Sequence, residues 1–149
     1  MKRKKILIVE DDQKIALAMA VRLRAGGYDV YSAFDAIGGL DMAVKHRPDL
    51  VLLDISMPAG SGFEVAEKIQ GLSTTAGTPM IFVTASRNPD FLTRAAELGA
   101  VAFIQKPFQD GELLSDVRHA LREDIGEEKA EPMNQSPSGT VKGTRKAEG

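Results

Sequence analysis

The sequence contains no cysteine, so it has neither a disulfide framework nor a thiolate metal site, which fits a reducing compartment. It also lacks an excess of basic residues. Its formal net charge is −2 and its pI is near 5.7, which argues against binding bulk nucleic acid. No apolar run approaches the roughly 20 residues of a membrane-spanning helix. The first run, Ile6 to Val9, is too short for a signal-peptide core.

Five short apolar runs alternate with five amphipathic patterns in the first 123 residues, and this alternation predicts an α/β fold with a parallel, doubly wound sheet. The predicted strands are Lys5–Val9, Asp29–Ala33, Leu50–Leu53, Met80–Val83 and Val101–Gln105. The predicted helices are Gln13–Ala25, Ala36–His46, Gly62–Gln70, Pro89–Leu98 and Asp110–Glu123.

Residues at the predicted helix ends support these boundaries. Gly26-Gly27 is expected to end the first helix in the left-handed conformation. Asp35 and Asn88 are expected N-caps, and Ser61 with Glu64 forms the pattern of a capping box. From Asp124 onward large apolar residues are scarce, so residues 124–149 are predicted to be a disordered polar tail that follows one domain, residues 1–123.

Polar side chains follow four of the predicted strands. Asp11 and Asp12 come after the first strand, Asp54 after the third, Thr84 after the fourth and Lys106 after the fifth. The carboxyl ends of strands in such a sheet border its ligand crevice, so we expect these groups to lie together. This set suits a divalent cation and a phosphoryl group.

The chemistry of each group fits that interpretation. Carboxylates are the ligands that Mg²⁺ prefers, and crowded carboxylates without a cation raise one another's pKa. An aspartate such as Asp54 can attack phosphorus to form an acyl phosphate. Lys106 would neutralise the phosphoryl oxygens, and Thr84 would offer a hydroxyl donor.

In this order, the motifs resemble the receiver domain of two-component response regulators over about residues 4–123. The motifs are Val9-Glu10-Asp11-Asp12, Leu53-Asp54-Ile55-Ser56-Met57-Pro58 with Gly62, Val83-Thr84-Ala85 and Lys106-Pro107-Phe108. The resemblance implies a flavodoxin-like (βα)5 fold with strand order 2-1-3-4-5, and a stand-alone receiver in the cytoplasm.

The resemblance also implies roles at the metal and phosphoryl site. Asp54 would accept a phosphoryl group from a sensor histidine kinase or a histidine phosphotransfer protein. Asp11, Asp12 and Asp54, with the backbone carbonyl of Ser56, would hold Mg²⁺. The chain would catalyse only its own phosphorylation and dephosphorylation.

Further residues would carry the signal to a partner. Lys106 would contact the phosphoryl group, Thr84 would move toward it, and Phe103 would rotate inward. The Lys106-Pro107 peptide is commonly cis in this family. The face of the fourth helix, fifth strand and fifth helix would bind a downstream protein, or the phosphate would pass on in a phosphorelay. We expect surface residues of the first helix, such as Ala18, to set kinase choice. We expect no nucleic-acid binding by this chain itself and no membrane contact.

Simpler interpretations remain open. Asp12 partly serves as a helix cap, and Phe103 fits an ordinary strand aromatic. The whole chain would alternatively be a pseudo-receiver, which binds partners without phosphorylation, or a piece of a longer regulator. A phosphohydrolase with an aspartyl-phosphate intermediate is disfavoured because Ser56 stands where such enzymes place a second carboxylate.

Overall fold

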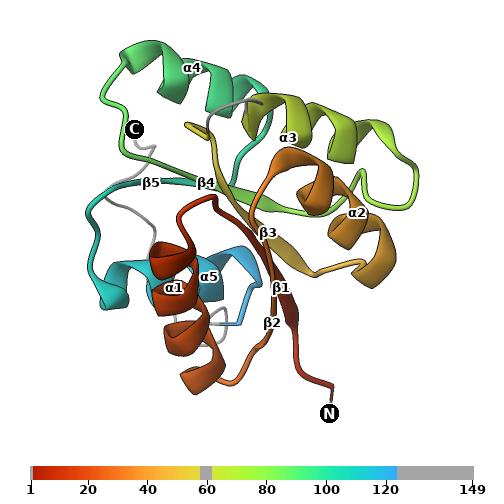
Figure 1. The fold of residues 1–149 in the computed structure, drawn as a ribbon, viewed down its shortest axis with the longest axis vertical. Coiled ribbons are helices and arrows are strands. Elements are labelled where there is room, and N and C mark those ends of the chain that lie inside the picture. Colours follow the sequence, from red (N-terminus) through yellow and green to blue (C-terminus); the bar gives the residue numbers. More distant parts are fainter. Residues whose placement is uncertain (1, 58–61, 124–149) are drawn as a thin grey trace.

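The structure, a computed structural model, describes residues 2–57 and 62–123. Within them, strands and helices alternate and the strands form one parallel sheet in the order β2-β1-β3-β4-β5 (Figure 1). The strands are β1 (Lys5–Val9), β2 (Asp29–Ala33), β3 (Leu50–Asp54), β4 (Met80–Thr84) and β5 (Ala102–Gln105). The helices are α1 (Gln13–Ala25), α2 (Ala36–His46), α3 (Gly62–Gly71), α4 (Pro89–Glu97) and α5 (Asp110–Ala120).

The predicted fold class and strand order are confirmed, and most boundaries differ by one residue or not at all. β3 and β4 each include one more residue than predicted, because Asp54 and Thr84 still pair in the ladder, with Val83 and Gln105 respectively. The last helix is the main difference: α5 ends at Ala120, three residues before the predicted end.

The predicted caps explain where the helices begin and end. The side chain of Asp35 accepts a hydrogen bond from the Gly38 amide, and that of Asn88 accepts one from the Asp90 amide. At the end of α1, Gly26 has a right-handed conformation and only Gly27, with φ of 99°, is left-handed, so that part of the cap prediction shifts by one residue. The expected cap Ser61 and the predicted disordered tail lie outside the described residues.

Alternation along the strands divides the core into two layers. In β1, Ile6 and Ile8 pack under α1 and α5, whereas Leu7 and Val9 pack under α2 and α3 on the opposite face (Figure 1). Each fully buried side chain of this kind stabilises the fold by about 1.5–3 kcal/mol. Every residue of β3 is buried, so the central strand is a rigid support for the residue at its end, Asp54.

Two further features of the fold concern a peptide bond beside Lys106 and the length and polarity of the helices. The Lys106-Pro107 peptide is cis, as the family resemblance implies. Across residues 2–57 and 62–123, every helix is too short or too polar to cross a membrane.

Candidate functional site

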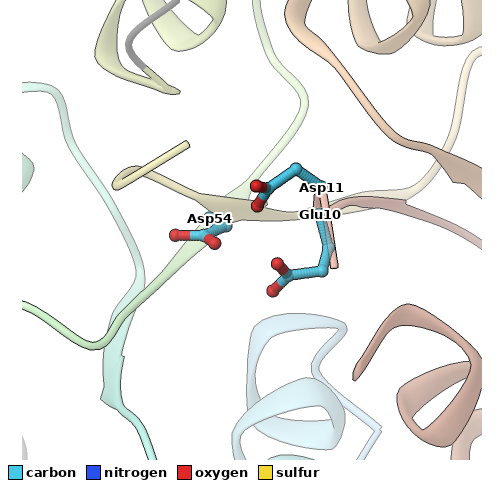
Figure 2. A group of neighbouring side chains, drawn as sticks. All are labelled: Glu10, Asp11 and Asp54. Atoms are coloured by element: carbon cyan, nitrogen blue, oxygen red, sulfur yellow. The ribbon is translucent and has the colours of Figure 1, made fainter. Parts of the chain in front are cut away.

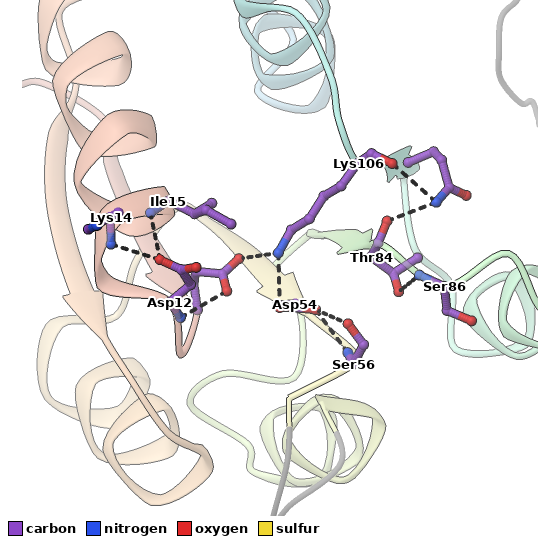
Figure 3. Close-up of polar contacts among 10 residues, drawn as sticks. Asp12, Lys14, Ile15, Asp54, Ser56, Thr84, Ser86 and Lys106 are labelled. Atoms are coloured by element: carbon purple, nitrogen blue, oxygen red, sulfur yellow. Dashed lines mark hydrogen bonds and ion pairs between the residues drawn. The ribbon is translucent and has the colours of Figure 1, made fainter.

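Asp54 lies at the carboxyl end of the central strand and is only 4% exposed. Its Oδ1 accepts hydrogen bonds from the Ser56 amide at 2.9 Å and from the Ser56 hydroxyl at 2.8 Å. Its Oδ2 accepts one from Lys106 Nζ at 3.1 Å (Figure 3). Both carboxylate oxygens therefore have donors, and the side chain is held in one orientation.

Lys106 joins the ends of three strands. Its Nζ donates to Glu10 Oε1 at 2.7 Å as well as to Asp54, and its backbone amide donates to the Thr84 carbonyl at 2.8 Å. Burial opposes the charged form of Lys106, but the bond to Glu10 and the charges of Glu10 and Asp54 outweigh it, so its pKa is raised. Lys106 therefore stays a cation beside Asp54.

The acidic group consists of Glu10, Asp11 and Asp54, whose carboxylate oxygens lie within 4.8 Å of one another (Figure 2). Burial raises the pKa of Glu10 to about 7, although its bond to Lys106 works in the other direction. Burial also works against ionised Asp54, but the amide and hydroxyl of Ser56 and the charge of Lys106 outweigh it and lower its pKa. Asp54 is therefore the carboxylate that is kept ionised.

Asp12 takes the helix-cap position that the sequence analysis allowed for it. It is the N-cap of α1, and its Oδ1 accepts hydrogen bonds from the amides of Lys14 at 2.9 Å and Ile15 at 3.2 Å. Glu10 instead occupies the group with Asp11 and Asp54, and its Oε2 accepts from the Asp12 amide. The helix N-terminus thus engages the Asp12 carboxylate, and the role of Asp12 as a Mg²⁺ ligand stays a prediction.

Thr84 and Phe103 make no hydrogen bond to Asp54 among the described residues. Thr84 is fully buried, and its hydroxyl oxygen accepts from the Ser86 amide at 2.9 Å. Phe103 is half-buried and lies opposite Phe82 in the β4–β5 register. Their expected movements stay predictions, as does the role of the Ser56 carbonyl.

Sequence reasoning missed two contributions. It gave no role to Glu10, although placing the first helix at Gln13 makes Asp12 the residue that caps it and leaves Glu10 free for the site. It also missed the hydroxyl of Ser56 as a donor to Asp54, which depends on how the chain turns after β3.

The donor set fits a magnesium ion. Three carboxylates converge, and the one cation that contacts them is Lys106, in the part of the chain that the structure describes. Burial is the main cause of the raised pKa of Glu10, and the negative charge of the neighbouring Asp54 raises it further. Hard oxygen ligands of this kind are those that Mg²⁺ prefers, so a divalent cation would relieve the repulsion.

Comparisons with known proteins agree with this geometry. A family model described as the response regulator receiver domain matches residues 6–118. The DNA-binding dual master transcriptional regulator RpaA of Synechocystis is 36% identical over 79% of this chain and 49% of its own length. The uncharacterized transcriptional regulatory protein YkoG of Bacillus subtilis is 40% identical over 85% of this chain and 57% of its own length. The chain thus spans about half the length of these curated relatives.

Solved structures give the same result. A CheY-like receiver domain protein of Methanospirillum hungatei has a TM-score of 0.77 and 32% identity, covering 85% of this chain and 99% of that one. The receiver domain of the sensor histidine kinase PA1611 of Pseudomonas aeruginosa has a TM-score of 0.74 and 25% identity, covering 81% and 99%, and has magnesium coordinated in its active-site cleft. The chain belongs to the family of response regulator receiver domains, which serve two-component signalling.

Proposed function

We propose that this chain is a phosphorylation switch in which Asp54 accepts a phosphoryl group from a histidine kinase or a histidine phosphotransfer protein. The observation that carries the proposal is the surroundings of Asp54: it is buried at the end of β3 and lies 3.1 Å from the ammonium of Lys106, which helps to lower its pKa. A carboxylate in these surroundings can act as a nucleophile toward phosphorus. Lys106 is a cation that would offset the negative charge that Asp54 gains with the phosphoryl group.

The reaction moves a phosphoryl group from the phosphohistidine of the donor to the carboxylate of Asp54. A carboxylate oxygen of Asp54 attacks phosphorus, a P–O bond forms, and the P–N bond of the phosphohistidine breaks, with its electron pair returning to the imidazole. Water later attacks phosphorus, which releases inorganic phosphate and restores the carboxylate. The chain thus acts only on itself, and Lys106 offsets charge on the phosphoryl oxygens.

A metal ion belongs to this proposal. Glu10, Asp11 and Asp54 are the side chains that would hold Mg²⁺, with the Ser56 carbonyl as a further candidate. When bound, the ion neutralises charge on the phosphoryl oxygens. Asp12 would keep the start of α1 in place beside it.

A groove supports docking of the donor beside α1. It has a volume of about 450 Å³, is largely apolar, and extends from Ile15 and Ala18 on α1 to Phe108 after β5. Lys106 and Ala85 also line it, so a donor in this groove reaches the edge of the site. Residues on α1, Ala18 among them, would therefore set kinase choice.

The output would use the face of α4, β5 and α5. Phosphorylation adds roughly −1 to −2 charge at the end of β3, and Thr84 and Phe103 would move in response. α4 is suited to change because Ala95 is its only buried residue. The relatives named as transcriptional regulators extend beyond the part that matches this chain, and a separate output segment or protein would read this face. We place the phosphoryl transfer to Asp54 in the cytoplasm.

Intact-mass measurement with acetyl phosphate and Mg²⁺ tests the proposal. The wild-type chain and the control Asp29→Asn, which removes an exposed carboxylate at the far end of β2, should gain one phosphoryl group. Asp54→Asn should gain none, and EDTA should abolish the gain in all variants. A gain by Asp54→Asn would contradict the assignment. Failure of the wild type with both acetyl phosphate and a panel of phosphorylated kinases would leave an unphosphorylated interaction module.

A further inference from the structure

Large apolar side chains are exposed on one side of the molecule, around the edge strand β2. Leu17 and Val21 lie on α1, Phe34 follows β2, and Ile37 lies in the first turn of α2. Leu17 is 61% exposed and Ile37 is 78% exposed. Single exposed apolar residues are ordinary, but a group of them marks an interaction site. We call these four residues the β2-edge patch.

Two members of the patch, on α1 and after β2, lie side by side at the edge of the sheet. Leu17 and Phe34 line the same groove, of about 420 Å³, between α1 and the end of β2. β2 pairs with β1 alone, so its other edge faces outward, but Arg24 donates to the Val30 carbonyl there at 3.0 Å. A partner would thus meet side chains from both helices rather than an open strand edge.

Charges of opposite sign flank the patch. Lys14 and Arg24 are exposed on the same side of α1 as Leu17, and Asp41 is exposed one turn after Ile37 on α2. None of the three takes part in an ion pair within residues 2–57 and 62–123. The patch therefore has an apolar centre, a positive flank on α1, and on α2 the acidic Asp41 next to Ile37, with the exposed Lys45 one turn further on.

Such a surface is complementary to itself. In a dimer with two-fold symmetry both copies use the same patch. When α1 of one copy contacts α2 of the second, α2 of the first copy also contacts α1 of the second. We propose that the β2-edge patch is where two copies of this chain associate. In this arrangement Lys14 and Arg24 of each copy face Asp41 of the other copy. The four apolar side chains of each patch become buried in the interface.

This association does not depend on the phosphorylation site. Asp54 lies at the centre of the sheet, and the donor groove lies on the other flank of α1, where Arg22 pairs with Asp110. Dimerisation should therefore occur in the unphosphorylated chain and in Asp54→Asn alike. A failure of this inference would leave the proposed reaction at Asp54 untouched.

Sedimentation equilibrium of the full 149-residue chain, at increasing concentration, tests the proposal. The wild type should show a monomer–dimer equilibrium. Ile37→Glu should weaken dimerisation by at least about ten-fold, since it buries a charge at the centre of the interface. Leu92→Glu, at an exposed apolar position on α4, is the matched control and should dimerise as the wild type does. Circular dichroism confirms that each variant is folded.

A charge exchange tests the orientation of the two copies. Lys14→Glu and Asp41→Lys should each weaken dimerisation, by up to about five-fold, and the double variant should recover the wild-type affinity. A chain that stays monomeric throughout overturns the proposal and leaves the patch to another protein or to residues 124–149. A dimer that Ile37→Glu does not weaken, or that Leu92→Glu weakens equally, also overturns it.

Discussion

The end of β3 and the surface between α1 and α5 contain the same kinds of groups in opposite surroundings. Lys106 and Glu10 approach to 2.7 Å with side chains that are 14% and 2% exposed, whereas Arg22 and Asp110 approach to 2.5 Å with side chains that are 54% and 53% exposed. The shorter ion pair is the less valuable one, because water already solvates both of its charges. Burial, rather than distance, makes the first pair part of a site.

A glycine and a serine complete the comparison. A Cβ on Gly62 would lie 2.4 Å from the Asp54 carbonyl oxygen, whereas a Cβ on Gly111 in α5 would meet nothing within 4 Å. Ser56 donates to Asp54, whereas Ser115 is exposed on α5. Each residue near β3 therefore has a matched control between α1 and α5, and the difference between the two regions becomes measurable.

Removal of the buried cation should have the largest effect. Without divalent metal at pH 8, Lys106→Met leaves Glu10 and Asp54 buried without a counter-charge, so the free energy of unfolding should fall by about 3–5 kcal/mol. Arg22→Met breaks the exposed pair and should change it by no more than about 1 kcal/mol. Urea denaturation in EDTA measures both. Equal losses would show that the Lys106 pair behaves as a surface pair.

An added methyl group should have the next effect. In Gly62→Ala the Cβ meets backbone atoms of Asp54 and Ile55, which cannot yield as a flexible side chain does, so the free energy of unfolding should fall by about 2–3 kcal/mol. Gly111→Ala should raise it by up to about 1 kcal/mol through helix propensity. Thermal or urea unfolding of the two variants gives the comparison, and a neutral Gly62→Ala would mean that α3 is free to move away from β3.

The same contrast explains what the sequence predicts and what it does not. α1 and α2 agree with the predicted boundaries because capping residues and periodicity are local signals. The convergence of Asp54, Thr84 and Lys106 is also predictable, because parallel strands bring their carboxyl ends to one edge.

The choice between Glu10 and Asp12 depends on more than local pattern. Three acids follow β1 in a row, and the requirement for a cap on α1 decides which of them faces outward. The burial of Glu10 and its bond to Lys106 depend on packing between β1 and the end of β5, which no single segment encodes. The β2-edge patch is similar, since its residues become neighbours only once the helices pack.

The smallest expected effect concerns the hydroxyl of Ser56, and it has a pH dependence of known sign. The pKa of Asp54 is lowered in the folded chain, so its contribution to stability is present above its ordinary pKa of 3.8 and is lost as pH falls through the folded value. Ser56→Ala removes one donor to Oδ1 and keeps the amide donor, so the pKa of Asp54 should rise. In EDTA at pH 7 the variant should be about 1 kcal/mol less stable than the wild type.

That deficit should shrink as pH falls below 3.8, because protonated Asp54 no longer needs the donor. Urea denaturation at a series of pH values follows the stability, and NMR titration of the Asp54 carboxyl follows the pKa directly. Ser115→Ala, on the exposed face of α5, is the control and should follow the wild type at every pH. A deficit for Ser56→Ala that stayed constant with pH would assign the loss to packing rather than to the bond with Asp54, and would leave the Ser56 amide and Lys106 as the groups that keep Asp54 ionised.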